Sequence, residues 1–273
     1  MTTESAATDQ SAQPRGAIIV GASSGIGAAL AHELAADGYE VGLTARRTEQ
    51  LKAVGGKLPT KAYVATMDVT DTETAREHFF ELADAMPSVD LVVISAGVGD
   101  ANYALEWETE RQTIDVNVRG FTAIATAAME YFESRAGENG VEAESEDENR
   151  NTDESPGADG HLVGLSSVAA YFGNGGTQAY NASKAYVSRY LEGLRSRQVG
   201  NDADITITTI EPGFVDTELS YGSFWECSPE TAASQIADAI HEERDHAYVT
   251  RRWRLVTWVL KALPESAIRR LFA

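Results

Sequence analysis

Cysteine and long apolar runs are scarce in this chain of 273 residues. Its single cysteine, Cys227, allows neither an internal disulfide nor a cysteine-rich zinc site. The five histidines lack the spacing of metal ligands, so no metal is expected. No run of about 18 apolar residues occurs, which excludes a membrane-spanning helix. Residues 1–15 also lack the apolar stretch of a secretory signal, so a cytoplasmic location is the default expectation.

Lysine is scarce as well, and the charge balance is strongly negative. The chain has 22 basic residues, of which five are lysine, against 42 acidic residues, for a net charge of −20. Such a chain repels phosphate backbones, so nucleic acid is not an expected partner. A surface rich in carboxylates and poor in lysine suits very high salt, where charge repulsion is screened. We therefore hypothesise a halophilic protein; the alternative is an ordinary acidic protein with one acidic insert.

Short apolar stretches alternate with helical patterns from Gly16 onward. We predict strands over 17–20, 41–45, 62–67, 90–94, 161–165, 204–210 and 247–249. Apolar residues at helical spacing predict helices over 25–37, 72–85, 105–135, 178–198 and 229–243. This alternation predicts one α/β domain over 16–249, a doubly wound parallel sheet of the Rossmann type.

Three segments stand outside this alternation. Residues 1–15 are polar and aperiodic, and we expect a disordered tail. Residues 137–160 hold nine acidic residues and one large apolar side chain, which predicts a disordered surface insert. Residues 250–273 predict basic amphipathic helices, because the last 30 residues carry a net charge of +5 interleaved with tryptophan and leucine. Such helices can lie on an anionic membrane surface. The alternative is that they pack on the domain or on a partner subunit.

A glycine-rich turn joins the first predicted strand to its helix. It reads Gly21, Ala22, Ser23, Ser24, Gly25, Ile26, Gly27. Glycines let a backbone turn tightly and approach a pyrophosphate without a clash with Cβ atoms. The helix start adds free N–H groups and the positive end of its dipole. The turn therefore predicts a dinucleotide site.

The end of the second predicted strand indicates which dinucleotide. An acidic residue there would bind the ribose 2′-hydroxyl of NAD, but this strand ends in Arg46 and Arg47. Guanidinium groups suit a 2′-phosphate, so NADP(H) is favoured over NAD(H). The alternative is that both arginines are surface charges at a helix entrance. Asp68 and Val69, after the third strand, are placed to contact the adenine.

Tyr180 and Lys184 are the candidate catalytic pair. Residues four apart share one face of a helix, so the phenol and the ammonium can point into one site. A nearby cation favours the phenolate form, which suits Tyr180 as a general acid or base. Ser167 follows the fifth predicted strand at the carboxyl edge of the sheet, where ligands bind. Its hydroxyl can donate to a substrate oxygen that becomes negative.

Together these motifs resemble the short-chain dehydrogenase/reductase family. The resemblance covers about residues 16–240, in order and spacing. The matching residues are 21–27, Asp68-Val69, Ser95-Ala96-Gly97, 115–120, Ser166-Ser167, 180–184 and Pro212-Gly213. It implies an NADP(H)-dependent oxidoreductase that interconverts a small-molecule carbonyl and an alcohol, with Ser167, Tyr180 and Lys184 in the roles argued above. The alternative is a nucleotide-binding sensor that has lost its chemistry.

The same resemblance implies further site residues and an assembly. Asn117 is implied to lie where its helix opens locally and to take part in a proton relay from Lys184. The implied cofactor contacts, beyond the glycine turn, Tyr180 and Lys184, are Ala96, Gly97, Pro212, Gly213, Val215 and Thr217. A homodimer or homotetramer through the two long middle helices is also implied.

Two positions depart from the family pattern. Val20 stands where threonine is usual, and Ile94-Ser95 stands where two asparagines are usual. Both changes remove hydrogen-bonding groups near the cofactor, and we expect them to compensate each other by apolar packing. Aromatic residues in the loops above the expected site could line an apolar substrate pocket or simply pack in their loops. These residues are Tyr171, Phe172, Tyr221, Phe224 and Trp225.

Overall fold

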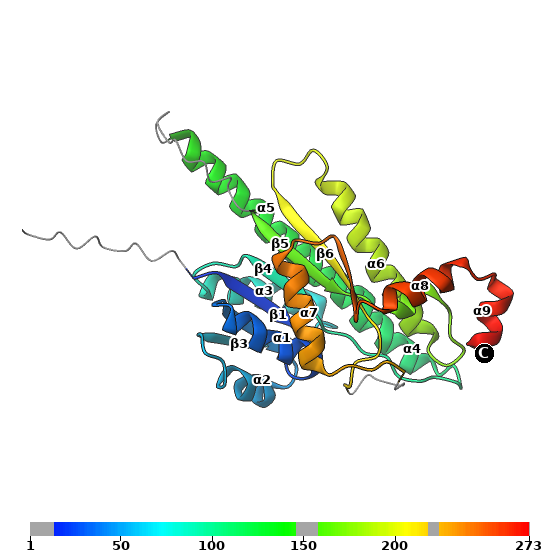
Figure 1. Ribbon diagram of the computed structural model, residues 1–273. Coiled ribbons are helices and arrows are strands. Elements are labelled where there is room, and N and C mark those ends of the chain that lie inside the picture. Colours follow the sequence, from blue (N-terminus) through cyan, green and yellow to red (C-terminus); the bar gives the residue numbers. More distant parts are fainter. Residues whose placement is uncertain (1–13, 146–157, 218–223, 273) are drawn as a thin grey trace, which may run out of the picture.

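The computed structural model describes residues 14–145, 158–217 and 224–272 (Figure 1). Seven strands form one parallel sheet in the order β3-β2-β1-β4-β5-β6-β7. The strands are β1 (Gly16–Val20), β2 (Glu40–Ala45), β3 (Ala62–Thr66), β4 (Leu91–Ile94), β5 (Gly160–Leu165), β6 (Ile205–Pro212) and β7 (His246–Val249). The predicted Rossmann-type sheet is therefore confirmed.

Helices cover both faces of this sheet. The helices are α1 (Gly25–Ala36), α2 (Thr48–Gly55), α3 (Thr72–Ala85), α4 (Trp107–Ile114), α5 (Phe121–Ser145), α6 (Gln178–Gln198), α7 (Pro229–His241), α8 (Trp253–Ala262) and α9 (Glu265–Leu271). On one face α3, α5 and α6 bury Phe79, Ile124 and Leu191. On the other face α1 and α7 bury Leu30 and Ile236. The two apolar layers fix the sheet between them and so hold its carboxyl edge in place.

The strand order reverses between β1 and β4, next to each other at the centre of the sheet. Every residue of β1, β4 and β5 is buried, as their continuous apolar runs predict for strands covered on both faces. In open α/β sheets, ligands bind at the carboxyl edge beside such a reversal. The fold therefore places the candidate site at the ends of β1, β4, β5 and β6.

The predicted helix over 105–135 is three elements in the structure. A π-helix over Asp115–Gly120 separates α4 from α5. The structure also differs from the sequence prediction at the acidic segment 137–160, because α5 continues to Ser145. A helix already formed by packed residues can be extended without an apolar face, because each added residue costs far less than the first turn did. The rest of that segment up to 157, and the expected tail up to residue 13, lie outside the described residues.

The two C-terminal helices lie at the carboxyl edge of the sheet. On α8, Trp253, Thr257 and Leu260 are buried against the domain. The opposite side of α8 exposes Leu255 and Trp258, with Trp258 76% exposed. The helix therefore packs on the domain through one face and presents a second apolar face outward.

Candidate active site

The glycine turn after β1 has no space for side chains. Gly21 and Gly25 have φ angles of 95° and 56°, in the region that favours glycine. A Cβ on Gly27 would lie 2.2 Å from the carbonyl oxygen of Gly21, and a Cβ on Gly21 would lie 2.5 Å from the amide nitrogen of Ala96. The turn thus forms a backbone cradle at the N-terminus of α1. Free N–H groups at a helix start suit a phosphate, so these residues fit a dinucleotide.

Arg47 and Thr217 border this cradle. The Nη2 of Arg47 donates to Ser23 Oγ at 3.1 Å and to Ser24 Oγ at 2.6 Å. The methyl group of Thr217 lies 3.1 Å from the position of a Cβ on Gly25. The structure therefore brings a guanidinium and a threonine from distant parts of the chain to the predicted phosphate site.

Arg46, Asp68 and Val69 lie at the neighbouring strand ends. Arg46 is exposed beside Arg47. The exposed carboxylate of Asp68 accepts hydrogen bonds from the backbone N–H and the hydroxyl of Thr70 through Oδ1. Val69 is buried, and its side chain would lie 2.7 Å from a Cβ on Gly120. Asp68 thus presents an ordered carboxylate at the expected adenine end of the site.

Helix α6 carries the candidate catalytic pair, one helical turn apart. The ammonium of Lys184 lies 5.8 Å from the centre of the Tyr180 ring. It donates to the carbonyl oxygen of Leu165 at 2.9 Å, its one hydrogen bond among the described residues. Lys184 is 6% exposed, and this burial lowers the pKa of its ammonium to about 8. A buried cation with two donor positions left over beside a phenol is suited to hold polar groups of a ligand.

Ser167 lies directly after β5 and caps a 3-10 helix over Val168–Tyr171. Its hydroxyl accepts from the backbone N–H of Ala169 at 3.1 Å. It donates to the carbonyl oxygen of Pro212 at 3.4 Å, across to the end of β6. The following Gly213 lies against Trp253, whose indole nitrogen would be 1.8 Å from a Cβ there. The expected nicotinamide segment therefore lies beside Ser167, the candidate catalytic serine.

Asn117 lies in the π-helix, as the implied local opening of its helix requires. Its Nδ2 donates to the carbonyl oxygen of Val98 at 2.7 Å and to Ser183 Oγ at 3.0 Å. Its Oδ1 accepts from the N–H of Val98 at 2.9 Å. A Cβ on Gly97 would lie 3.3 Å from the Lys184 ammonium and 3.4 Å from Asn117 Oδ1. Gly97, Asn117 and Lys184 therefore meet at one point.

The two departures from the family pattern lie opposite each other in the sheet. Val20 on β1 and Ile94 on β4 are register partners, and each is buried in the same apolar cluster. The two side chains therefore pack in one apolar cluster, and the expected compensation for the missing hydrogen-bonding groups stays a prediction. Val215, in the expected nicotinamide segment, packs its side chain into the core on the α1 and α7 face, and its expected contact with the cofactor stays a prediction.

The aromatic residues of the loops pack in different ways. Phe172 stacks on Phe272 of the C-terminal segment, with ring centres 3.9 Å apart. Phe224 stacks on Trp225, and both are exposed. Tyr171 turns toward the sheet, and Tyr221 lies outside the described residues. In the described portion, no group of three or more potential metal ligands occurs.

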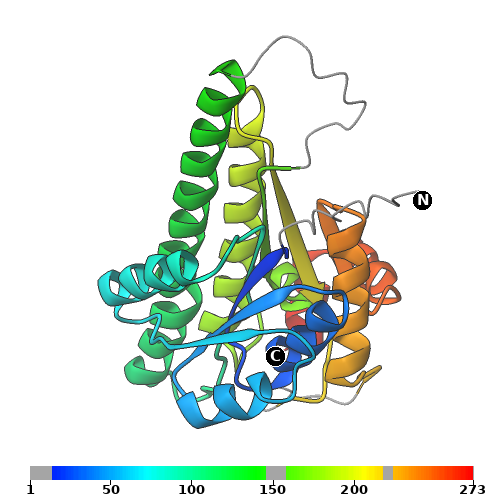
Figure 2. The same ribbon diagram turned by 90° about the vertical axis from the view of Figure 1, so that its left-hand side faces the viewer.

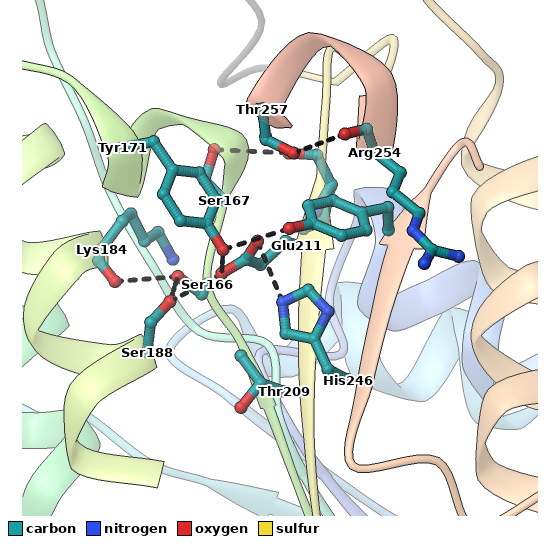
Figure 3. A network of polar contacts seen from close by, with 12 residues as sticks. Ser166, Ser167, Tyr171, Lys184, Ser188, Thr209, Glu211, His246, Arg254 and Thr257 are labelled. Carbon is teal, nitrogen blue, oxygen red and sulfur yellow. Dashed lines mark hydrogen bonds and ion pairs between the residues drawn. The ribbon is translucent and has the colours of Figure 1, made fainter. Parts of the chain in front are cut away.

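One buried residue near the site escaped the sequence prediction. Glu211 is the residue before Pro212 on β6 and is 1% exposed, with its carboxylate surrounded by hydroxyl groups (Figure 3). The predicted strand ended at residue 210, so Glu211 fell into an expected loop. The sequence did hold a sign of Glu211. An acidic residue directly after an apolar strand, at the carboxyl edge where ligands bind, has to be paired or functional if it is buried.

Comparisons with known proteins agree with this geometry. The family model for short chain dehydrogenases matches residues 15–145 and 153–224. An uncharacterised oxidoreductase of Myxococcus xanthus is 33% identical, with 94% of this chain and 97% of that protein covered. Another from Mycobacterium tuberculosis is 30% identical, with 93% of this chain and 95% of that protein covered.

Solved structures share the fold. A short chain dehydrogenase/reductase from Burkholderia phymatum, in complex with NAD, gives a TM-score of 0.73 at 19% identity, covering 90% of this chain and 92% of that chain. An alcohol dehydrogenase from Thermococcus sibiricus, complexed with 5-hydroxy-NADP, gives a TM-score of 0.68 at 22% identity, covering 86% and 95%.

Proposed function

The chain belongs to the short-chain dehydrogenase family, and we propose that it is an NADP(H)-dependent oxidoreductase that interconverts a carbonyl and a secondary alcohol. One observation supports this most directly. A buried ammonium, Lys184, with two donor positions left over lies one helical turn from Tyr180 at the glycine-cradled edge of the sheet. A fold that only bound nucleotide would have no need to bury a cation beside a phenol, since burial of a charge is costly.

The residues of the site divide the work of the reaction. When bound, a reduced nicotinamide supplies the hydride that adds to the carbonyl carbon. Ser167 donates a hydrogen bond to the carbonyl oxygen as negative charge develops on it. Tyr180 transfers its proton to that oxygen, and Lys184 favours the resulting phenolate and holds the ribose hydroxyls. Asn117 fixes the backbone of Val98 and the turn of Ser183 around this centre, at the start of the proton path from Lys184.

Tyr180→Phe tests the assignment. Because general acid–base catalysis contributes about 10²- to 10⁴-fold, we expect kcat to fall by about 10³-fold while the Kd for NADPH stays within about twofold. Tyr186→Phe is the matched control, since it removes a hydroxyl on the same helix whose hydrogen-bond partner among the described residues is Thr122. The measurements are NADPH oxidation with a panel of carbonyl compounds and NADPH fluorescence titration. Full activity of Tyr180→Phe would refute the role.

The alternative function, a nucleotide-binding sensor, is separated by the same assay. A sensor would bind NADPH with a normal stoichiometry and yet oxidise it with none of the carbonyl compounds. The oxidoreductase requires turnover in the wild type that is lost in Tyr180→Phe and kept in Tyr186→Phe.

The preference for NADP(H) is supported by Arg47. Its guanidinium is held at the cradle by Ser23 and Ser24, where a 2′-phosphate could accept charge-assisted hydrogen bonds. We expect Arg46→Ala with Arg47→Ala to weaken NADPH binding by about 10- to 100-fold, since hydrogen bonds to charged groups contribute about 1.5–3 kcal/mol. NADH binding should change by less than threefold or so. An equal loss for both dinucleotides would contradict the preference.

The proposed assembly is a homodimer or homotetramer through α5 and α6. These two long helices lie side by side along one face of the molecule (Figure 2). Light scattering after size-exclusion chromatography would give the subunit number, and a monomer at micromolar concentration would refute this part of the proposal.

We also propose that α8 contacts an anionic membrane surface. In the part of the chain that the structure describes, no helix combines the length and apolar character needed to cross a bilayer. However, α8 exposes Leu255, Trp258 and Val259. Exposed cations flank them, namely Arg251, Arg252, Arg254 and Lys261, in a chain whose net charge is −20. A basic helix with an outward aromatic face fits anionic headgroups. Such headgroups would attract α8, whereas they would repel a surface rich in carboxylates.

Vesicle co-sedimentation tests the membrane contact. We expect binding to phosphatidylglycerol vesicles but not to phosphatidylcholine vesicles, and its loss when Leu255, Trp258 and Val259 are all replaced by serine. Val199→Ser is the control, because Val199 is 86% exposed at the far end of α6. Equal sedimentation of the triple variant, or loss of an oligomer rather than of vesicle binding, would contradict the proposal and favour a subunit interface.

The charge balance supports the proposal of a halophilic protein. Repulsion between carboxylates is screened at high salt. The melting temperature should therefore rise as the KCl concentration increases from 0.5 M toward saturation. A melting temperature that stays constant across this range would remove the proposal.

A further inference from the structure

A buried carboxylate, that of Glu211, lies near Ser167 and Lys184 (Figure 3). Oε1 of Glu211 accepts hydrogen bonds from the hydroxyl of Tyr171 at 2.9 Å and from Ser188 Oγ at 3.0 Å. Its Oε2 lies 3.0 Å from Nε2 of His246 on the neighbouring strand β7. The hydroxyl of Tyr248, also on β7, lies 3.3 Å from that of Tyr171. Four elements, namely β6, the 3-10 helix, α6 and β7, therefore meet around this side chain.

The first of these contacts holds the segment of the catalytic serine. Tyr171 ends the 3-10 helix that Ser167 begins, and Glu211 immediately precedes Pro212, whose carbonyl oxygen accepts from the Ser167 hydroxyl. The hydrogen bond between Tyr171 and Glu211 thus ties both sides of Ser167 together. Burial, followed by the bond to Glu211, raises the pKa of Tyr171, so its phenol stays protonated and donates.

The second contact holds the helical turn of Lys184. Ser188 lies one turn after Lys184 on α6 and donates to the same oxygen of Glu211. Ser166 Oγ lies 2.7 Å from Ser188 Oγ and 2.8 Å from the backbone oxygen of Lys184. Ser166 directly precedes Ser167 in the chain. The carboxylate is therefore linked to both catalytic segments through a short chain of hydroxyl groups.

We propose that Glu211 is a positioning residue, which sets the catalytic serine segment and the Lys184 turn of α6 in fixed relation through one buried carboxylate. An ionised carboxylate is suited to this because it only accepts, so several hydroxyl donors can converge on it. Removal of either donor should loosen one segment, whereas removal of the carboxylate should loosen both. A displacement of about 1 Å in a catalytic group can cost about 10²-fold in rate, so such a loss of order reaches the chemistry.

Hydrogen exchange of the full-length protein tests the inference without any substrate. In Glu211→Gln we expect faster amide exchange in both segments, residues 166–172 and 182–190. Tyr171→Phe should affect the first segment only, and Ser188→Ala the second only. Glu192→Gln, which changes an exposed glutamate on the same helix, should affect neither. Unchanged exchange in Glu211→Gln, or the same uniform increase across the whole sheet in every variant, would overturn the proposal.

The kinetic counterpart rests on the proposed function, and its failure can be told apart from failure of that function. The assay uses a carbonyl compound that the wild type reduces, and kcat is calculated per NADPH-binding site. Glu211→Gln should lower this kcat by about 10-fold, while KM and the Kd for NADPH stay within about twofold of the wild type. The pair Glu211→Gln and Tyr171→Phe should be less than additive in kcat, because both act on the same hydrogen bond: the first replaces its charged acceptor with a neutral amide oxygen and the second removes its donor.

A kcat that falls only in proportion to NADPH-binding capacity would show a purely structural role and overturn the inference. If Glu211→Gln does not fold, the milder Tyr171→Phe and Ser188→Ala variants keep Glu211 and carry the test. Additive losses in kcat in their double variant would support two independent hydrogen bonds to Glu211, one to each segment. Wild-type activity in both would contradict the inference.

Discussion

The carboxyl edge of the sheet and the outer face of α8 depart from ordinary packing in opposite directions. At the sheet edge, Lys184 and Glu211 are buried although both carry ionisable groups. On α8, Leu255 and Trp258 are exposed although both are apolar. Each arrangement costs stability when the domain is considered alone. The buried ionisable groups at the sheet edge fit the proposed reaction on a small molecule, and the exposed apolar side chains of α8 fit the proposed contact with a surface.

The largest effect is expected for Lys184→Met, which removes the buried charge. Activity should fall by about 10³-fold, because the phenol loses its neighbouring cation. The free energy of unfolding should nevertheless rise by about 1 kcal/mol, since an apolar chain of similar size replaces a poorly paired buried ion. Enzyme assays and urea denaturation measure both. Lys52→Met, at an exposed pair with Glu49, is the control. Destabilisation by Lys184→Met would show that the buried ammonium stabilises the fold and does not cost stability.

His161 is a buried titratable side chain that lies away from the carboxyl edge of the sheet, so it tests whether burial of such groups is confined to that edge. It is the second residue of β5, near the opposite edge of the sheet, and is 8% exposed, with Nε2 2.8 Å from Thr208 Oγ1. Burial lowers its pKa from 6.5 to about 4, so the unfolded chain binds a proton first as pH falls. The contribution is intact above pH 6.5 and is lost toward pH 4, by about 3 kcal/mol.

Urea denaturation between pH 7.5 and pH 4 measures this loss. His161→Gln should flatten the dependence by that amount, whereas His32→Gln, at an exposed position, should leave it unchanged. An equal slope in wild type and His161→Gln would contradict the expected role of burial.

Gly27→Ala tests the backbone cradle. The new Cβ would lie 2.2 Å from the oxygen of Gly21, so the turn must shift. We expect a loss of about 2 kcal/mol in the free energy of unfolding and about a 10-fold weaker Kd for NADPH. Gly193→Ala on α6 meets no atom within 4 Å and should stabilise the protein by about 0.5 kcal/mol. Similar effects of the two substitutions would argue against a close-fitting turn.

The smallest effects concern the two faces of α8. Leu260→Ala should cost about 2 kcal/mol, because Leu260 is 5% exposed. Leu255→Ser should change the free energy of unfolding by less than about 0.5 kcal/mol, because Leu255 is 69% exposed. Thermal denaturation at one fixed protein concentration separates them. A large loss for Leu255→Ser would mean that a partner subunit covers this face.

Local patterns were enough to predict most of the candidate site at the carboxyl edge of the sheet. The continuous apolar runs of β1, β4 and β5 and the glycine turn each depend on residues close in sequence, and the structure has them at the predicted places. The one-turn spacing of Tyr180 and Lys184 likewise placed both on one helix face. Their expected catalytic roles rest on the experiments above.

The remaining features depend on contacts between distant residues. Glu211 could not be assigned from the sequence, because its partners Tyr171, Ser188 and His246 come from three other parts of the chain. The extension of α5 to Ser145 was missed because the acidic segment has no apolar stripe. The two faces of α8 could not be told apart either, since only the position of the domain decides which one is covered.

The connection between α5 and β5 enters the sheet at Gly160, at the amino edge and so remote from the reaction. In a parallel sheet the ligand lies at the carboxyl edge. Loops at the amino edge can therefore change in length without changing the site. An affinity tag or fluorescent reporter inserted in the acidic stretch before Gly160 would therefore leave turnover intact, which gives a practical handle for immobilising the enzyme.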